Sequence, residues 1–164
     1  MTTIQPIAAD DIERVKDIRL RALRDAPAAF GSTYERERML TPDEWRDRAA
    51  RWDGRSGIGF LATEEGAAVA IAGAFLDPDD AKSAQLVSMW TAPHSRRRGV
   101  GRLLVGEVVA WARRRGAQVV RLMVTSNNES AIAFYRSLGF ELTGRTEPYP
   151  NDPALVEYEM SLTL

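Results

Sequence analysis

Residues 86–104 have the sequence Leu86-Val-Ser-Met-Trp-Thr-Ala-Pro-His-Ser-Arg-Arg-Arg-Gly-Val-Gly-Arg-Leu-Leu104, which combines three patterns in one short stretch. The apolar first part predicts a strand that ends at Pro93, because proline has no N–H to donate to a sheet. Gly99 and Gly101 allow a sharp turn, and apolar residues at helical spacing follow them. A helix N-terminus presents unpaired N–H groups and a partial positive charge, to which Arg96–Arg98 add full charges. The stretch therefore predicts a phosphate-binding turn between a strand and a helix.

Two common phosphate-binding motifs do not fit this spacing. A Walker loop needs Gly-Lys-Ser/Thr, and no lysine lies near the turn. A dinucleotide-binding fingerprint needs a third glycine three positions after Gly101, where this sequence has Leu104. The pattern that remains is Arg96-x-x-Gly99-x-Gly101.

A second motif lies farther along the chain and reads Asn128-x-x-Ala131-x-x-x-Tyr135-x-x-x-Gly139-Phe140. The two motifs, in this order and at this spacing, resemble the signatures of the GCN5-related N-acetyltransferases (GNAT family), which bind coenzyme A with the first of them. The resemblance covers the chain from about Gln85 to the C-terminus, and the first half only in the order of its predicted elements. It implies that residues 1–164 form one N-acetyltransferase domain.

The rest of the chain predicts strands and helices in mixed order. Periodicity and turn residues place strands at about 3–7, 58–63, 69–76, 85–90, 119–124, 140–143 and 156–162, and helices at about 11–25, 42–51, 101–115 and 129–138. The proline-rich stretch 144–153 predicts a long loop. This order predicts an α+β fold, with a mixed central sheet of about six to seven strands flanked by about four helices. The family resemblance adds that two central strands splay apart.

Composition narrows the classes of function. The net charge of −1 favours neither a nucleic-acid nor a membrane partner, and the absence of cysteine excludes disulfides and thiolate chemistry. No Asp, Glu or His cluster has metal-ligand spacing, so we expect no metal site. The first residues contain neither a basic region nor an apolar run typical of a secretion signal, so we expect a cytoplasmic protein.

The resemblance implies acetyl-CoA as co-substrate. It assigns the pyrophosphate to the turn, the pantetheine arm to the end of the preceding strand, and a further contact with the arm to Asn128. Asn128 also precedes a predicted helix, and an asparagine at that position can cap the helix by accepting a hydrogen bond from one of its first N–H groups. The predicted cofactor-binding residues are Met89, Trp90, Thr91, Arg96, Arg97, Arg98, Gly99, Val100, Gly101, Arg102, Asn128 and Tyr135.

The resemblance also makes Tyr135 the catalytic residue that protonates the departing thiolate. A phenol with a pKa near 10 holds its proton at neutral pH and can donate it. A general base is harder to find, because Val87, Ser88 and Met89 offer no carboxylate on the strand before the turn, where many family members place one. Glu35, Glu37 or a chain of waters are the alternatives.

The family places the acceptor near the region between the first two helices, which makes Tyr34, Glu35 and Glu37 the candidate acceptor contacts. Arg19 lies on the apolar stripe of the first helix, and we expect its stem to pack there while its guanidinium reaches water or a carboxylate. The alternative is that the guanidinium contacts an anion inside the cleft. The leading prediction is acetylation of a small-molecule primary amine. Acetylation of a protein N-terminus or lysine, and a non-catalytic acyl-CoA sensor, are the alternatives. A homodimer is an expectation from the family alone.

Overall fold

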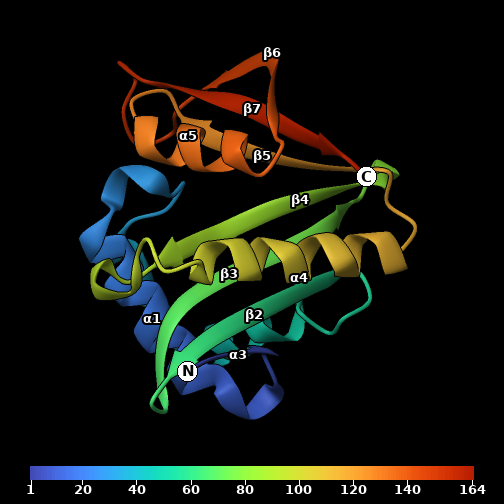
Figure 1. The fold of residues 1–164 in the computed structure, drawn as a ribbon. Helices are drawn as coiled ribbons and strands as arrows, with labels where there is room; N and C mark the ends of the chain where they lie inside the picture. The colour runs from blue at the N-terminus through green and yellow to red at the C-terminus, as the bar shows by residue number, and fades with distance from the viewer.

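The computed structural model describes all residues, 1–164, and its central element is one open seven-stranded sheet (Figure 1). The strand order is β1-β2-β3-β4-β5-β7-β6. The strands are β1 (Thr2–Pro6), β2 (Gly57–Glu64), β3 (Ala67–Asp77), β4 (Asp80–Thr91), β5 (Val119–Thr125), β6 (Glu141–Pro148) and β7 (Val156–Thr163). The helices are α1 (Ile12–Asp25), α2 (Tyr34–Glu37), α3 (Pro42–Ala50), α4 (Val100–Arg114) and α5 (Glu129–Ser137).

All neighbouring strands pair antiparallel except β4 and β5, which run parallel. The turn between β2 and β3 has positive φ at both Glu65 (49°) and Gly66 (83°), a conformation that matches the twist of a two-residue hairpin. One parallel pair in an otherwise antiparallel sheet confirms the predicted mixed sheet and α+β fold.

The helices cover both faces of the sheet. Helices α4 and α5 lie on one face, α4 in front of β2–β4 and α5 in front of β5, while α1 and α3 lie behind (Figure 1). The apolar stripe of α1, which includes Ile18 and Leu23, is buried against β2–β4, and the stripe of α4, which includes Leu104 and Val108, is buried on the opposite face. This burial holds the two layers in place. No helix has both the length and the apolar character needed to cross a membrane.

Strands β4 and β5 pair only at one end. Ser83–Gln85 face Val119–Arg121, and beyond this point neither strand pairs with the other. The register between β3 and β4 also shifts between Ile71 and Gly73, and Ser88 has a φ of 57°, which marks a bulge in β4. This geometry confirms the predicted splayed pair and leaves one edge of β4 without a strand partner.

The prediction of a long loop over residues 144–153 is wrong for its first half. Strand β6 continues to Pro148 and pairs with β7, with a register shift between Leu142 and Thr146. Gly144 has a φ of 91° and lets the strand bend there without ending. Local sequence did not reveal this extension, because the hydrogen-bond partners of β6 come from β7.

Two glycines that face each other across β2 and β3 make a slot for a tryptophan. Gly59 pairs with Gly73, and the indole ring of Trp52 lies against both. A Cβ atom on Gly59 would lie 2.5 Å from the Trp52 ring and 2.7 Å from Cδ1 of Ile7. The missing side chains therefore fix where the indole lies.

We expect Gly59→Ala to lower the free energy of unfolding by roughly 1–3 kcal/mol, because the new methyl group overpacks this slot. Urea denaturation monitored by circular dichroism measures the change. Gly106→Ala is the matched control, since a Cβ there meets nothing within 4 Å and α4 gains helix propensity. Equal stability of Gly59→Ala and wild type would contradict the slot.

Candidate functional site

The turn that leads into α4 contains a run of free backbone donors. The N–H groups from Arg97 to Arg102 donate no hydrogen bond within the protein, and the first helical bond runs from the Leu103 N–H to the Gly99 carbonyl at 3.1 Å. Arg97 (φ 60°) and Gly99 (φ 85°) both adopt left-handed backbone conformations. Successive free N–H groups at the positive end of a helix form a binding site for an anion such as phosphate.

Two of the predicted cofactor arginines already have protein partners. Arg96 donates from Nε to the Thr91 carbonyl at 2.9 Å and pairs with Asp25 at the end of α1. Arg98 pairs with Glu64 at 3.1 Å. These two arginines therefore fasten the turn to β4, α1 and β2.

The other two arginines of the turn are free. Arg97 and Arg102 are exposed and form neither an ion pair nor a side-chain hydrogen bond. They are the side chains that can meet an incoming anion without giving up a protein partner. Val100, between them, is buried and anchors the first turn of α4 in the core.

Gly101 has a packing reason for lacking a side chain. A Cβ atom there would lie 3.0 Å from the Phe134 ring and 3.2 Å from Cε of Met89. The start of α4 is thus in close contact with both α5 and the end of β4. Trp90 points to the opposite face of the sheet, where it is buried and its indole N–H donates to Asp25 at 2.9 Å.

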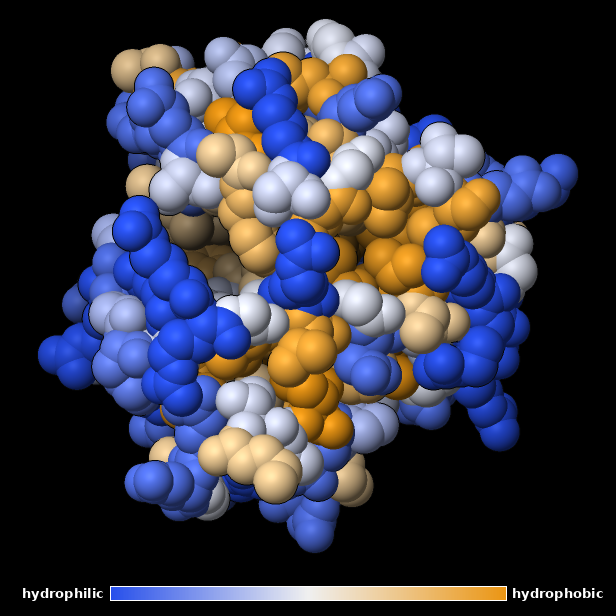
Figure 2. Space-filling view, viewed as in Figure 1, coloured by the Kyte–Doolittle hydropathy of each residue, from blue (hydrophilic) through white to orange (hydrophobic).

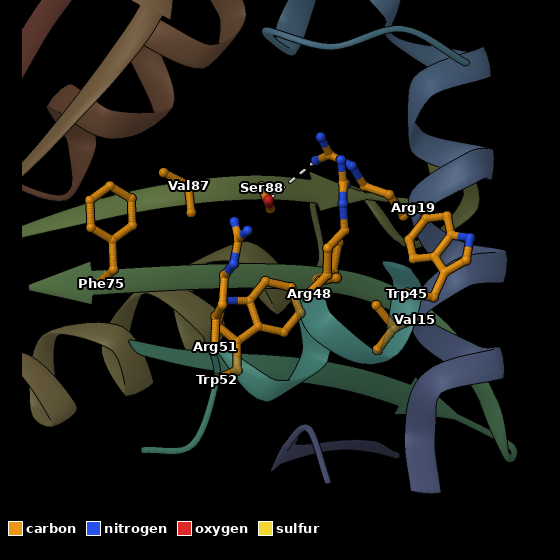
Figure 3. Close-up of a pocket in the computed structure, with 10 residues that line it drawn as sticks. Val15, Arg19, Trp45, Arg48, Arg51, Trp52, Phe75, Val87 and Ser88 are labelled. Atoms are coloured by element: carbon orange, nitrogen blue, oxygen red, sulfur yellow. Dashed lines mark hydrogen bonds between the residues drawn. The ribbon is translucent and has the colours of Figure 1, made fainter. Parts of the chain in front are cut away.

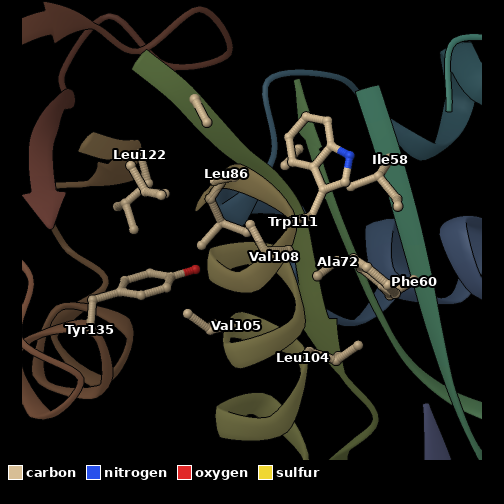
Figure 4. Close-up of a cluster of buried hydrophobic side chains, with 14 of the residues drawn as sticks. Ile58, Phe60, Ala72, Leu86, Leu104, Val105, Val108, Trp111, Leu122 and Tyr135 are labelled. Carbon is tan, nitrogen blue, oxygen red and sulfur yellow. The ribbon is translucent and has the colours of Figure 1, made fainter. Parts of the chain in front are cut away.

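Tyr135 lies in the gap that the splayed strands leave open. Figure 2 shows a recess between the half of the molecule that carries α5 and the half that carries α4, with apolar side chains inside it. Figure 4 shows Tyr135 reaching from the α5 half toward Leu86 on β4 and Val105 on α4. Its hydroxyl makes no hydrogen bond to the protein, yet it is not sealed from solvent. Burial raises the pKa of this phenol above its usual value, so it keeps its proton.

Asn128 has the capping role that its position suggested. Its side-chain oxygen accepts from the Ala131 N–H at 3.2 Å and from the Ser130 hydroxyl at 3.3 Å. The residue lies just beyond the end of β5 at Thr125, at the end of that strand where β4 and β5 are splayed. Its contact with the pantetheine arm stays a prediction.

Two adjoining pockets lie on the face of the sheet opposite α4. The first, here called the arginine pocket, has a volume of about 390 Å³ (Figure 3). The second, here called the glutamate pocket, has a volume of about 470 Å³. The arginine pocket is lined by Val15, Arg19, Trp45, Arg48, Arg51, Trp52, Ile71, Phe75, Val87 and Ser88. The charged walls of the glutamate pocket are Arg19, Asp77, Arg145, Glu147, Glu157 and Glu159.

Glu157 is a pocket carboxylate that our sequence analysis missed. It lies on β7 opposite Thr125 of β5 and Glu147 of β6, and its carboxylate forms no hydrogen bond or ion pair. Its neighbours are occupied, since Glu147 pairs with Arg145 at 2.8 Å and Glu159 accepts from the Thr143 hydroxyl at 2.9 Å. Burial, followed by the charge of Glu147, raises the pKa of Glu157 above the usual glutamate value.

The structure places none of the predicted acceptor residues in the lining of either pocket. Glu37 is fully buried, where it accepts two bonds of 3.0 Å from Arg19 and one of 2.8 Å from Arg48. Burial opposes the charge of Glu37, but the two arginines outweigh it and hold its pKa below the usual range. Glu37 is therefore poorly suited as a base, and its contacts confirm that the Arg19 guanidinium reaches a carboxylate.

The other two predicted acceptor residues, Tyr34 and Glu35, also belong to α2 and line neither pocket. Glu35 is exposed and pairs with Arg38 at 3.1 Å, so the structure does not support it as the base. The Arg24 guanidinium lies over the ring of Tyr34, with its Cζ atom 4.8 Å from the ring centroid. No group of three His, Cys, Asp or Glu side chains is arranged to hold a metal ion.

The turn with its free N–H groups and the splayed strands β4 and β5 occur in a chain whose sequence matches a known protein family. Residues 18–140 match the family model described as Acetyltransferase (GNAT) family. The chain belongs to this family. GNAT proteins are acyltransferases that use acetyl-CoA, so the family resemblance of the two motifs is confirmed.

Relatives of this GNAT chain agree in sequence and in fold. The ribosomal-protein-bS18-alanine N-acetyltransferase of Escherichia coli is 34% identical over 130 residues, which are 77% of this chain and 82% of that protein. A GNAT acetyltransferase from Streptococcus pneumoniae superposes with a TM-score of 0.85 at 18% identity and full coverage of both chains. The Salmonella typhimurium protein yncA, solved with its cofactor acetyl-CoA, superposes with a TM-score of 0.81 at 20% identity, and the match covers 100% of this chain and 94% of that one. This GNAT chain spans only 26% and 16% of the length of two further curated relatives.

Proposed function

We propose that this GNAT chain transfers the acetyl group of acetyl-CoA to a primary amine, by direct attack of the amine on the thioester. The observation that carries the proposal is the run of free N–H groups from Arg97 to Arg102, placed beside an unpaired edge of β4. Tyr135 and Glu157 lie on opposite faces of the same splay, one on the side of α4 and the other in the glutamate pocket.

Acetyl-CoA binds to the backbone N–H groups that have no partner in the turn and along the unpaired edge of β4. The N–H groups of residues 97–102 hold the pyrophosphate, and the free heads of Arg97 and Arg102 add charge-assisted bonds. The pantetheine arm lies along Met89–Thr91 like an added strand, since this edge of β4 has no partner. One N–H of this edge donates to the thioester oxygen and stabilises the developing negative charge.

Two side chains take part in the proton transfers. The protonated amine loses one proton to the Glu157 carboxylate, and the free amine nitrogen bonds to the acetyl carbon. The tetrahedral intermediate then loses its second nitrogen proton to water. The carbon–sulfur bond breaks, and the departing thiolate takes the proton of the Tyr135 hydroxyl. The products are an N-acetyl amine and coenzyme A, and water restores the protonation of both side chains.

Two classes of molecule are candidates for the acetyl acceptor. Both pockets have the volume of small-molecule sites, which favours a small amine. The second candidate is a protein N-terminus, because the Escherichia coli relative is named for acetylating the alanine of a ribosomal protein. Cytoplasmic location and a homodimer stay predictions.

Isothermal titration with acetyl-CoA tests the cofactor site. We expect the double variant Arg97→Gln/Arg102→Gln to raise the Kd by roughly 10- to 100-fold, because charge-assisted bonds to phosphate are lost. The loss should shrink at high salt, where the charges are screened. Arg113→Gln, at the far end of α4, is the matched control and should leave the Kd unchanged. Absence of acetyl-CoA binding by the wild type would overturn the proposed function.

A further inference from the structure

The arginine pocket carries more positive charge than the one carboxylate behind it can balance. Arg19, Arg48 and Arg51 line it, and no acidic side chain does. Glu37 lies behind the pocket and pairs with Arg19 and Arg48. Arg51 has no ion pair and no side-chain hydrogen bond. One guanidinium in this pocket is thus unpartnered, and a second, Arg48, binds Glu37 through a single nitrogen.

One wall of the arginine pocket is held in place by packing, and the arginines reach into the pocket from α1 and from the end of α3. Figure 3 shows Arg48 and Arg51 extending from the end of α3 toward the strand that carries Ser88, while Arg19 reaches in from α1. Trp52 forms one wall because the slot of Gly59 and Gly73 receives its indole. An aromatic pocket with a free guanidinium matches a small ligand that carries an oxyanion, since the planar fork of arginine fits carboxylate and phosphate oxygens.

The glutamate pocket beside it has the opposite charge. Four carboxylates and two arginines line it, and Glu157 is unpaired. The two pockets share Arg19, Phe75, Val87 and Ser88, so they meet at the bulge of β4 where the strands splay. A molecule that spans both would place a cationic amine beside Glu157 and an anionic group beside Arg51.

We infer that the acceptor is a small amine that carries an oxyanion, a carboxylate in the simplest case, and that Arg51 binds this group. The inference rests on the proposed function and chooses between its two acceptors. The α-amino group of a protein N-terminus has no carboxylate nearby, because its own carboxyl is part of a peptide bond. Such an acceptor leaves the Arg51 guanidinium without a partner.

A panel of acceptors with matched charges tests the inference. Free amino acids, each paired with its own carboxamide, are assayed for coenzyme A release, together with ω-amino acids of graded length and tripeptides with free N-termini. We expect kcat/KM for the best acid to exceed that for its amide by roughly 10- to 100-fold. Amidation lowers the pKa of the neighbouring amine, so a larger fraction of the amide is unprotonated and able to attack. A higher kcat/KM for the acid would therefore have to overcome this advantage of the amide.

Variants of α3 tie that preference to one side chain. Arg51→Gln should bring the ratio of acid to amide close to one, and Arg51→Glu should reverse it. The matched control is Arg46→Gln within α3, the helix that Arg51 follows; Arg46 is exposed, pairs with Asp43 and lines neither pocket. The control should keep the wild-type ratio.

The outcomes separate the inference from the proposed function. If tripeptides are acetylated and amino acids are not, or if the ratio does not depend on Arg51, the inference is overturned and acetyl transfer stands. If acetyl-CoA binds and no amine of any class is acetylated, the proposed function itself fails. A ratio that favours the acid and is lost in Arg51→Gln supports both.

Discussion

Tyr135→Phe should lower kcat by about 10²- to 10⁴-fold and leave the Kd for acetyl-CoA nearly unchanged. The hydroxyl is the part of this side chain that no protein group binds, and it faces the splay between β4 and β5. Burial raises its pKa above the ordinary tyrosine value, so the phenol is protonated throughout the neutral range. The same burial disfavours the tyrosinate left after donation, so solvent must return a proton to it in each turnover. Rapid-quench measurement of the chemical step, with titration of acetyl-CoA binding, checks both halves of this expectation.

The stability of this variant separates catalysis from folding. Since the hydroxyl has no hydrogen-bond partner to lose, Tyr135→Phe should unfold at the same urea concentration as the wild type. Tyr158→Phe is the matched control, because Tyr158 packs against the same core from β7. If Tyr135→Phe retains wild-type kcat with a thioester donor, the residue has only a packing role and the proton comes from water.

Glu157→Gln should lower kcat/KM by about 10²- to 10⁴-fold at neutral pH, because the acceptor then has no carboxylate to take its proton. The wild-type rate should fall as pH decreases through a pKa higher than the usual glutamate value of about 4.3, since protonated Glu157 is inactive. In the glutamine variant this acid limb should disappear, and the remaining rate should follow the ionisation of the acceptor amine. Profiles of kcat/KM against pH for both proteins measure this.

Two further variants define the cause of the raised pKa. Glu147→Gln removes the negative charge opposite Glu157, so the acid limb of kcat/KM should move to lower pH. Glu141→Gln, an exposed position at the other end of β6, should leave the limb where it is.

The substitution that lowers activity should not lower stability. A carboxyl group whose pKa is higher in the folded than in the unfolded protein destabilises the native state at pH values above that pKa, so Glu157→Gln should not lower the Tm at pH 7. An unchanged acid limb in Glu157→Gln would remove this residue from the mechanism.

The sequence by itself was sufficient for the features that depend on neighbouring residues in the chain. The turn at Gly99–Gly101 and the helix that follows it are local, because backbone conformation and free N–H groups are set within a few residues. The motif around Tyr135 is also local, since helical spacing fixes which side chains share a face. These two segments were enough to predict the family and the cofactor, and the order of strands and helices along the whole chain predicted the α+β fold.

The tertiary structure decided which charged side chains line the two pockets of the proposed acceptor site. Glu157 belongs to a strand whose alternation is the same whether its polar face meets water or a pocket, and only the position of β7 beside the splayed β5 distinguishes the two. Glu37 was a candidate base until its burial between Arg19 and Arg48 gave it a structural role. The arginine pocket joins α1, α3, β3 and β4, which packing alone brings together. Local patterns determined the backbone of the proposed cofactor site, whereas contacts between distant segments determined the charges of the proposed acceptor pockets.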